Sequence, residues 1–372
     1  MTTLSILEQL ISTPSYVDAT NNEEAISTLI FSMLEPLKGS WNMSTQTVDG
    51  NRRNILVTNS PAPEILFTAH MDTVPPSPLW KRNPFIPFRE GARLYGLGSV
   101  DMKAGLAAII QTLRTNVTTK RPTAALFYCG EEYDFCGMKK FVETTTWKPN
   151  LVVNPEPTDL LVLRGCRGVL EANIIVEGTA AHAAMGGGAN AIEITMQALA
   201  DLKEVLARRP PTELGATTMN IAGIRGGLSM QADALVIRPN VVPAFADVTF
   251  ELRLADETIT FQEIEGLLRD HISRAGGKLI QSQCRFLVRP MRSPSTRSET
   301  DEQALSQFPA GDQTRCGYFD TQLFVEKTPS PCAIIGPGPS LNAHTADEFV
   351  DLRDLEQLET WMKSLLIEKM HY

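Results

Sequence analysis

The sequence predicts an α/β domain in which helices cover both faces of a mixed sheet, with a smaller α+β domain inserted into it. In the first part of the chain, short apolar runs alternate with helical patterns, as they do in α/β sheets. From residue 167 the strand patterns are longer, and two amphipathic helices lie among them, which is typical of a ferredoxin-like, split βαβ sandwich. We therefore expect one discontinuous domain at 1–166 and 287–372, and an inserted domain at 167–286.

The first domain begins with two helical patterns and continues as strands separated by helices. Leu4, Leu7 and Ile11 have the spacing of an amphipathic helix, and a second helical face follows within 22–37. The apolar runs that predict strands lie at 54–58, 64–69, 124–128 and 151–153, and helical patterns lie at 102–113 and 138–145. After the inserted domain we expect a buried strand at 331–335, a loop at 336–348 and a last helix with Asp351 as its N-cap.

The inserted domain is predicted as strands with two helices on one face. Its first strand, 169–176, alternates between apolar and polar residues. The remaining elements are expected as a helix at 192–206, strands at 217–224, 234–237 and 246–254, a helix at 258–275 and a last strand at 278–288. Gly276 and Gly277 end the second helix.

Composition narrows the class of protein. The formal net charge is −9 and no basic run stands out, which argues against nucleic acid or an anionic membrane as a partner. Six cysteines without a C-x-x-C pair indicate free thiols in a reducing compartment. The first eleven residues lack a basic n-region, and no apolar stretch has the length of a membrane span. We expect a cytoplasmic protein.

Ionisable residues follow three of the four predicted strands of the first domain. His70 follows one strand, Glu131 and Glu132 follow another, and Glu156 follows a third. In open α/β sheets, ligands bind beyond the carboxyl ends of the strands. A core would not place charges at the same end of successive strands, although these residues taken one by one are also compatible with ordinary polar loops. Asp101 ends a glycine-rich loop directly before a helix, and we expect it to bridge two metal ions.

Two short motifs have a chemical meaning beside this expectation. In His70-x-Asp72, the carboxylate can accept the second N–H of a metal-binding imidazole and so fix its tautomer. In the pair Glu131-Glu132, one carboxylate can bind metal while its neighbour faces the substrate as a general base. Each motif alone occurs by chance, and most pairs of glutamates are solvated.

The ordered set of motifs resembles a known family. The motifs are His70-x-Asp72, Gly96-x-Gly98-x-x-Asp101-Met-Lys-x-Gly105, Glu131-Glu132, Glu156-Pro157, His182 in a glycine-rich context and His344-x-x-Asp347-Glu348. Together they resemble the dinuclear zinc amidohydrolase and exopeptidase family, which includes acetylornithine deacetylase, succinyl-diaminopimelate desuccinylase, aminoacylase and glutamate carboxypeptidase. The resemblance extends in order over nearly the whole chain.

The resemblance implies a role for each of these positions. His70 and Glu156 would bind one ion, Glu132 and His344 the other, and Asp101 both. Imidazole and carboxylate ligands suit zinc, with cobalt or manganese as possible substitutes. A hydroxide shared by the two ions would attack an amide carbonyl, with Glu131 as general base and Asp72 as a further catalytic residue. The family also has a cis peptide bond after the bridging aspartate, here Asp101–Met102.

Further residues of the inserted domain are implied by the same resemblance. His182 would reach the active site of a partner subunit in a homodimer and stabilise the oxyanion; the alternative is a loop histidine with local hydrogen bonds. Asn240 and Arg253 match the family's substrate-binding strand, and Arg253 would pair with a substrate carboxylate unless it forms only a surface ion pair. Gly317 and Gly336 are also candidate substrate-binding residues.

The resemblance implies that the protein removes the acyl group of an N-acyl amino acid, as acetylornithine deacetylase does in amino-acid biosynthesis. The alternatives are a dipeptidase or carboxypeptidase on the same scaffold, or a succinyl-diaminopimelate desuccinylase. Tyr318 and Phe319 are bulkier than the small hydroxyl residues that desuccinylases carry before the aspartate, here Asp320, and this weakens that assignment. A non-catalytic protein that has kept the fold is a further alternative, although no expected ligand is missing.

Overall fold

The computed structural model describes residues 1–229, 236–296 and 298–367. They form two compact units. Unit 1 contains Met1–Arg164, Arg292–Asp312 and Phe319–Tyr372, and unit 2 contains Gly165–Met291 and Gln313–Tyr318. Unit 1 is therefore built from both ends of the chain, and unit 2 is largely the segment between them.

Unit 1 is organised around a six-stranded mixed sheet with the order β1-β2-β6-β3-β7-β14. The strands are β1 (Asn42–Asp49), β2 (Arg52–Thr58), β3 (Ile65–His70), β6 (Thr123–Tyr128), β7 (Leu151–Asn154) and β14 (Cys332–Ile334). β2 runs antiparallel to both of its neighbours, whereas β6, β3, β7 and β14 are mutually parallel. The carboxyl ends of four strands consequently meet at one edge.

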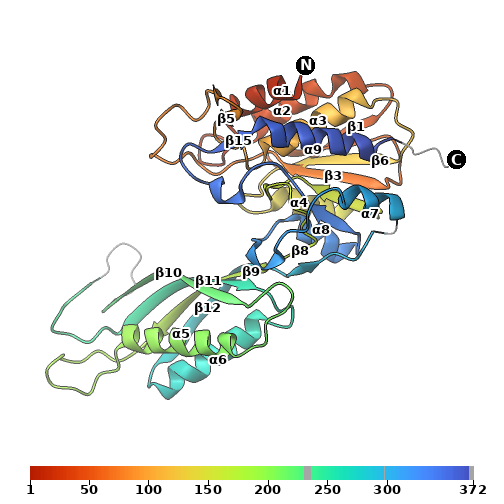
Figure 1. Cartoon of the computed structure of the whole chain (residues 1–372). Helices are drawn as coiled ribbons and strands as arrows, with labels where there is room; N and C mark the ends of the chain where they lie inside the picture. The colour runs from red at the N-terminus through yellow and green to blue at the C-terminus, as the bar shows by residue number, and fades with distance from the viewer. Residues whose placement is uncertain (230–235, 297, 368–372) are drawn as a thin grey trace. The chain divides into compact units, whose positions relative to one another are not determined.

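Helices cover both faces of this sheet (Figure 1). One face carries α1 (Thr3–Ile11), α2 (Glu24–Met33), α3 (Lys103–Thr115) and α9 (Leu352–Leu365), and the other carries α4 (Cys136–Thr144) and α8 (Thr321–Lys327). Every residue of β3 and β6 is buried, which explains their continuous apolar sequences. Asp351 caps α9 by accepting the backbone N–H of Arg353 at 2.9 Å, as the sequence predicted.

Shorter elements complete the two units. β15 (Phe349–Asp351), β5 (Arg93–Tyr95) and β4 (Phe88–Glu90) form a three-stranded antiparallel sheet, and β8 (Gly165–Cys166) pairs with β13 (Met291–Arg292). The remaining elements are α7 (Glu299–Leu305), η1 (Glu35–Leu37), η2 (Gln313–Arg315) and η3 (Ser340–Asn342). Of the short elements, β8 and η2 belong to unit 2, and β13 has one residue in each unit. The β15–β5 pairing matters for the site, because it joins the chain after residue 348 to the chain before residue 96.

Unit 2 is a four-stranded antiparallel sheet with two helices. Its order is β10-β11-β9-β12, which is the ferredoxin-like order for a βαββαβ chain. The elements are β9 (Gly168–Glu177), α5 (Ala191–Ala207), β10 (Thr218–Gly227), β11 (Phe245–Leu254), α6 (Phe261–Arg274) and β12 (Lys278–Val288). Alternate residues of β9, such as Leu170 and Ile174, pack under the helices in a core separate from that of unit 1. The predicted α/β fold with an inserted α+β sandwich is confirmed.

Several elements differ from the expectation. The helix predicted at 22–37 is two elements, α2 and η1, which meet at Leu34 just before Pro36. β1 and the short strands β4, β5 and β15 were not predicted. The strand expected at 234–237 falls partly outside the described residues, and Val236 and Ile237 do not belong to a strand.

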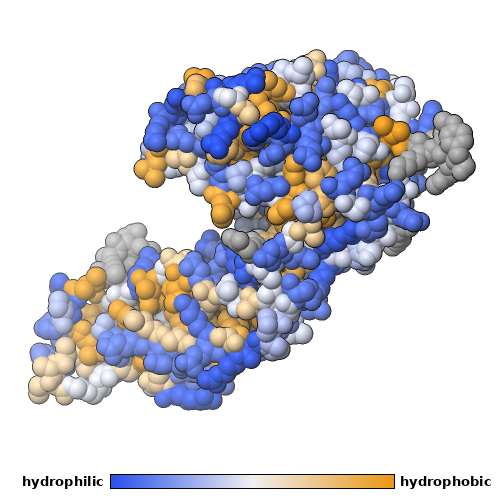
Figure 2. Space-filling model, in the orientation of Figure 1, coloured by the Kyte–Doolittle hydropathy of each residue, from blue (hydrophilic) through white to orange (hydrophobic). Residues whose placement is uncertain are grey.

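The described residues contain no helix that is both long and apolar enough to cross a bilayer. On the face drawn in Figure 2, hydrophilic and hydrophobic side chains are interspersed. Large apolar side chains exposed on unit 2 include Met196 on α5 and Ile224 on β10.

Candidate metal centre

Three neighbouring parallel strands bring four of the predicted site residues to one edge of the sheet. His70 is the last residue of β3, Glu131 and Glu132 follow β6, and Glu156 follows β7. These strands are adjacent in the order β6-β3-β7, so their carboxyl ends meet. The parallel register explains why residues 86 positions apart in sequence, His70 and Glu156, become neighbours.

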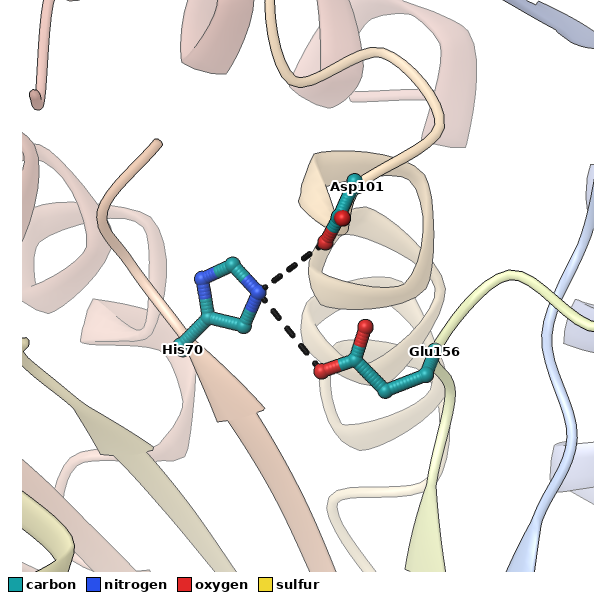
Figure 3. Close-up of side chains that lie close together, drawn as sticks. All are labelled: His70, Asp101 and Glu156. Carbon is teal, nitrogen blue, oxygen red and sulfur yellow. Dashed lines mark hydrogen bonds and ion pairs between the residues drawn. The ribbon is translucent and has the colours of Figure 1, made fainter. Parts of the chain in front are cut away.

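The first group of possible ligands is His70, Asp101 and Glu156 (Figure 3). The Nε2 atom of His70 lies 3.2 Å from Oδ1 of Asp101 and 3.6 Å from Oε1 of Glu156. His70 and Glu156 are buried, with 1% and 3% of their surface exposed. Asp101 reaches this group from the loop before α3, and its peptide bond to Met102 is cis, as the resemblance implied.

The second group is Asp101, Glu132 and His344. Nε2 of His344 lies 2.8 Å from Oε1 of Glu132 and 3.2 Å from Oδ2 of Asp101. His344 comes from the loop between β14 and β15, and its side chain is half exposed. Asp101 thus offers Oδ1 to one group and Oδ2 to the other, which is the geometry that a bridging carboxylate requires.

The chemistry of these contacts fits a cation between the side chains. A neutral imidazole Nε2 that faces a carboxylate oxygen at 3.2 Å needs either a proton or a metal ion between the two lone pairs. Within the described part of the chain, the buried Oε1 of Glu156 has no hydrogen-bond partner. Carboxylates gathered this closely repel each other unless positive charge lies among them. Imidazole and carboxylate donors suit zinc and similar divalent ions.

The pKa shifts report the same electrostatic situation. Burial raises the pKa of Glu156 well above its usual range, and the nearby charge of Asp101 raises it further. Burial alone would lower the pKa of His70, but Glu156 and Asp101 raise it well above the ordinary value. Hydrogen bonds with Asp101 and Glu132 raise the pKa of His344 to about 11. The surrounding acidic side chains therefore favour the protonated form of both imidazoles.

Glu131 lies beside both groups. Ligand atoms of Glu131, His70 and Glu132 lie within 4.8 Å of one another. The side chain of Glu131 is buried, and burial followed by the charge of Glu132 raises its pKa well above the usual range. A carboxylate with a raised pKa is a stronger base than a solvated one, which is what general base catalysis near neutral pH requires.

Asp72 makes different contacts from those that its motif predicted. The backbone carbonyl of Asp72, rather than its carboxylate, lies at hydrogen-bonding distance from Nδ1 of His70, at 3.0 Å; the nearest carboxylate oxygen is 3.6 Å away. The carboxylate instead accepts the backbone N–H groups of Gly130, Glu131 and Glu132 at 2.9–3.1 Å. Asp72 therefore orients the imidazole with its main chain and holds the Glu131-Glu132 loop with its side chain.

His182 and Asn240 lie together in unit 2. His182 forms an isolated β-bridge with Val241, and the N–H of Ala183 donates to the carbonyl of Asn240 at 2.9 Å. The side chain of His182 is exposed, and its Nδ1 accepts the N–H of Ala184 at 3.2 Å. These are the local hydrogen bonds of a loop histidine.

Arg253 and Gly317 form a second cluster of unit 2. The Nε of Arg253 donates to Oε1 of Glu251 at 2.6 Å, and its guanidinium lies 4.7 Å from the ring centroid of Tyr318. A Cβ atom at Gly317 would be 4.0 Å from Nη1 of the same arginine. Gly336 belongs to unit 1, where it is buried and a Cβ would be 2.2 Å from the carbonyl oxygen of Pro155.

The sequence did not predict that a buried acid, Asp320, lies near the ligand groups of unit 1. Oδ1 of Asp320 accepts the hydroxyl of Tyr128 at 2.7 Å, and Oδ2 has no partner among the described residues. Burial raises the pKa of Asp320 to about 7. Its neighbour Thr321 accepts the amide N–H of Asn154 on β7. In the sequence, Asp320 stands directly before the residues of α8, a position at which an aspartate usually indicates an ordinary N-cap.

Comparison with known proteins places this geometry in a family. Residues 66–368 match the model of peptidase family M20/M25/M40. Acetylornithine deacetylase of Shigella sonnei is 29% identical to this chain over 99% of the chain and 97% of its own length. Acetylornithine deacetylase of Klebsiella pneumoniae is 30% identical over 94% and 93% of the two chains.

Solved structures share the fold. A tripeptidase from Staphylococcus aureus has a TM-score of 0.77 at 19% identity, with 98% of this chain and 96% of that chain covered. A dinuclear metal-binding peptidase of the M20 family from Bacillus subtilis has a TM-score of 0.71 at 15% identity, with 98% and 96% covered. With the family model spanning both ligand groups, the chain belongs to peptidase family M20/M25/M40 and is an enzyme that acts on amide bonds.

Proposed function

We propose that this enzyme removes the acyl group of an N-acyl amino acid, in the manner of an acetylornithine deacetylase, with two divalent ions that are zinc in the cell. The observation that carries the proposal is the division of the Asp101 carboxylate between two ligand groups, with Oδ1 facing His70 and Oδ2 facing His344. The similarity to acetylornithine deacetylases over nearly the full length of both chains supports the substrate class.

The proposed ligands divide in the same way. His70 and Glu156 would hold one ion, Glu132 and His344 the other, and Asp101 both. When bound, the ions would polarise the amide carbonyl and lower the pKa of water toward about 7. Glu131 would accept the proton of the attacking water and return it to the leaving amine, a role to which its burial and raised pKa are suited. Asp72 would hold Glu131 in place through the backbone of the 130–132 loop.

We propose that a second subunit completes the active site with His182. The exposed side chain of His182 is available to a neighbouring molecule. β10 is one of the two edge strands of the unit 2 sheet and exposes Ile221 and Ile224, which supports pairing with a second copy of the chain. In the complex, the partner subunit's His182 would stabilise the oxyanion of the tetrahedral intermediate, and Arg253, Asn240 and the Gly317 loop would contact substrate.

Gly336, buried at the carbonyl of Pro155, would act by allowing the chain to pass close to Glu156.

We also propose a cytoplasmic location, because all six cysteines are free thiols, as in reducing compartments.

A substrate panel tests the reaction. N-acetyl, N-formyl and N-succinyl amino acids and dipeptides would be incubated with the zinc-loaded enzyme and with chelated enzyme. We expect chelator-sensitive release of acetate, and a loss of at least about 100-fold in kcat for Glu131→Gln with two ions still bound. Glu143→Gln is the matched control, because Glu143 has a side chain that is 65% exposed on α4. Turnover of dipeptides alone would favour the peptidase alternative, which other members of the fold represent.

Mixing two inactive variants tests the shared site. Glu131→Gln and His182→Ala would each be inactive as homodimers. In a mixed dimer, one site would combine an intact Glu131 with an intact His182 from the other subunit, and activity should return. If mixed dimers form and remain inactive, His182 does not act across the subunits.

A further inference from the structure

We propose that Glu348 is a positioning residue for the second ion, because it ties the loop that carries His344 to the loop that carries Asp101. Glu348 is 1% exposed, and its carboxylate points at backbone rather than at a ligand atom. Oε2 accepts the N–H of Gly98 at 3.0 Å, and Oε1 accepts the N–H groups of Val100 and Asp101 at 2.8 and 3.1 Å. The inference rests on the proposed metal binding and adds a residue to it.

The contacts repeat, at a second loop, the arrangement that Asp72 makes at the first. Asp72 accepts three backbone N–H groups of the 130–132 loop, and Glu348 accepts three of the 98–101 loop. Each loop delivers a carboxylate of the second ligand group, Glu132 and Asp101 respectively. Three backbone N–H groups that converge on one buried side chain fix the position of the loop that carries them, because each would lose its partner if the loop moved.

The position of Glu348 in the chain, four residues after His344, also lets it act on the loop of that histidine. His344 precedes it by only four residues and has a half-exposed side chain on a loop whose backbone has φ of 62° at His344 and 60° at Asp347. Residues other than glycine seldom adopt this left-handed conformation without support from their surroundings. The carbonyl of Glu348 also accepts the N–H of Gly96 at 3.1 Å, where β15 begins to pair with β5. Both main-chain and side-chain atoms of Glu348 thus anchor the end of the His344 loop.

The substitution Glu348→Gln tests whether Glu348 acts by accepting backbone hydrogen bonds or only by filling space in the interior. Glutamine has the same shape but only one acceptor oxygen, so the N–H of Gly98 or those of Val100 and Asp101 would face an amide NH₂. Loss of partners that orient metal ligands typically weakens metal binding 10- to 100-fold. We expect a loss of about this size for one of the two zinc ions.

Asp301→Asn provides the matched control. Asp301 is a fully buried carboxylate of unit 1, and its oxygens accept from Nη2 of Arg121 at 2.6 and 2.8 Å, away from the ligand groups. The change is again carboxylate to amide at a buried site. It should lower the melting temperature of the metal-free and the zinc-loaded protein alike, and leave zinc affinity unchanged.

The test is calorimetric titration of the metal-free full chain with zinc, together with melting curves with and without zinc. For Glu348→Gln we expect one site weakened 10- to 100-fold and a smaller zinc-induced rise in melting temperature, because stabilisation by a ligand follows its affinity. Two sites within twofold of wild type, or an affinity loss matched by Asp301→Asn, would overturn the inference. A wild-type chain that binds no zinc would instead remove the proposed metal centre itself, so the two failures are distinguishable.

Discussion

Replacement of Gly105 by alanine should disturb the first ligand group, although alanine favours helices. Gly105 is the third residue of α3, and a Cβ there would lie 2.5 Å from the carbonyl oxygen of Pro155 and 2.7 Å from its ring. Ordinary contact begins near 3.4 Å. The backbone at Pro155 or the helix must therefore move by about 0.9 Å, the difference between these distances. Glu156 follows Pro155 directly, and a functional site tolerates displacements of about 0.5 Å.

The energetic result can be worked from the same contacts. Overpacking of this kind costs about 1–3 kcal/mol, and a carbonyl and a proline ring cannot rotate away, which favours the upper part of that range. Alanine returns at most about 1 kcal/mol through its helix propensity. We expect Gly105→Ala to lower the free energy of unfolding by about 1–2 kcal/mol, and to weaken zinc binding at the group of His70, Asp101 and Glu156.

Gly266 offers the control. It lies inside α6, and no atom lies within 4 Å of a Cβ built there. Gly266→Ala should therefore stabilise the protein by about 0.5–1 kcal/mol and leave zinc affinity unchanged. Urea unfolding and zinc titration of the two variants measure both effects. If Gly105→Ala is as stable as Gly266→Ala and binds zinc as the wild type does, the close approach of α3 to Pro155 does not position Glu156.

Two predictions concern pH in the chelated protein. Burial raises the pKa of Asp320 to about 7, so the folded state holds this proton more tightly than the unfolded state. The stability of the wild type should therefore fall as pH rises from about 4 to about 7. Asparagine cannot ionise, so the free energy of unfolding of Asp320→Asn should gain up to roughly 4 kcal/mol over wild type as pH rises through that window, at about 1.4 kcal/mol per pKa unit. A difference in urea stability between the two proteins that is the same at pH 5 and at pH 8 would refute this. His344 has a pKa raised to about 11, so its stabilising contribution is complete below its unfolded pKa of about 6.5 and is lost as pH rises toward 11. Chelated protein should therefore melt lower at pH 8.5 than at pH 6.5, while the zinc-induced rise in melting temperature grows over the same interval; a zinc effect independent of pH would count against His344 as a ligand.

The sequence predicted the main strands and the edge at which they deliver charge, because both depend on local patterns. A buried parallel strand is an apolar run, and His70 or Glu156 directly after such a run is visible without a structure. β1 was not predicted because most of its residues are exposed, so its sequence shows no apolar face from which a strand could be recognised. β5 and β15 are three-residue strands that exist only through their pairing across the chain.

The hydrogen bonds around the ligand groups were harder to predict than the residues of those groups. The hydrogen bonds of Glu348 join residues about 250 positions apart in sequence and go to backbone N–H groups, which leave no trace in residue type. The Tyr128–Asp320 contact spans 192 positions and is likewise invisible to periodicity. Asp72 shows the same limit from the other side: its motif indicated the correct neighbour, His70, but the main chain makes the contact.

The discontinuity of unit 1 has a consequence for how the enzyme is made. His70 and His344 are separated by 274 residues, and all of unit 2's main segment is synthesised between them. At about 5–20 residues per second, roughly 14–55 s pass on the ribosome between the two ligands. Once residue 156 has been made, the nascent chain holds His70, Asp101, Glu132 and Glu156, but it still lacks the loop of His344, the strand β14 and the helix α9. A nascent chain therefore cannot assemble the second ligand group, and under the proposed mechanism amide hydrolysis has to wait until synthesis has passed residue 344.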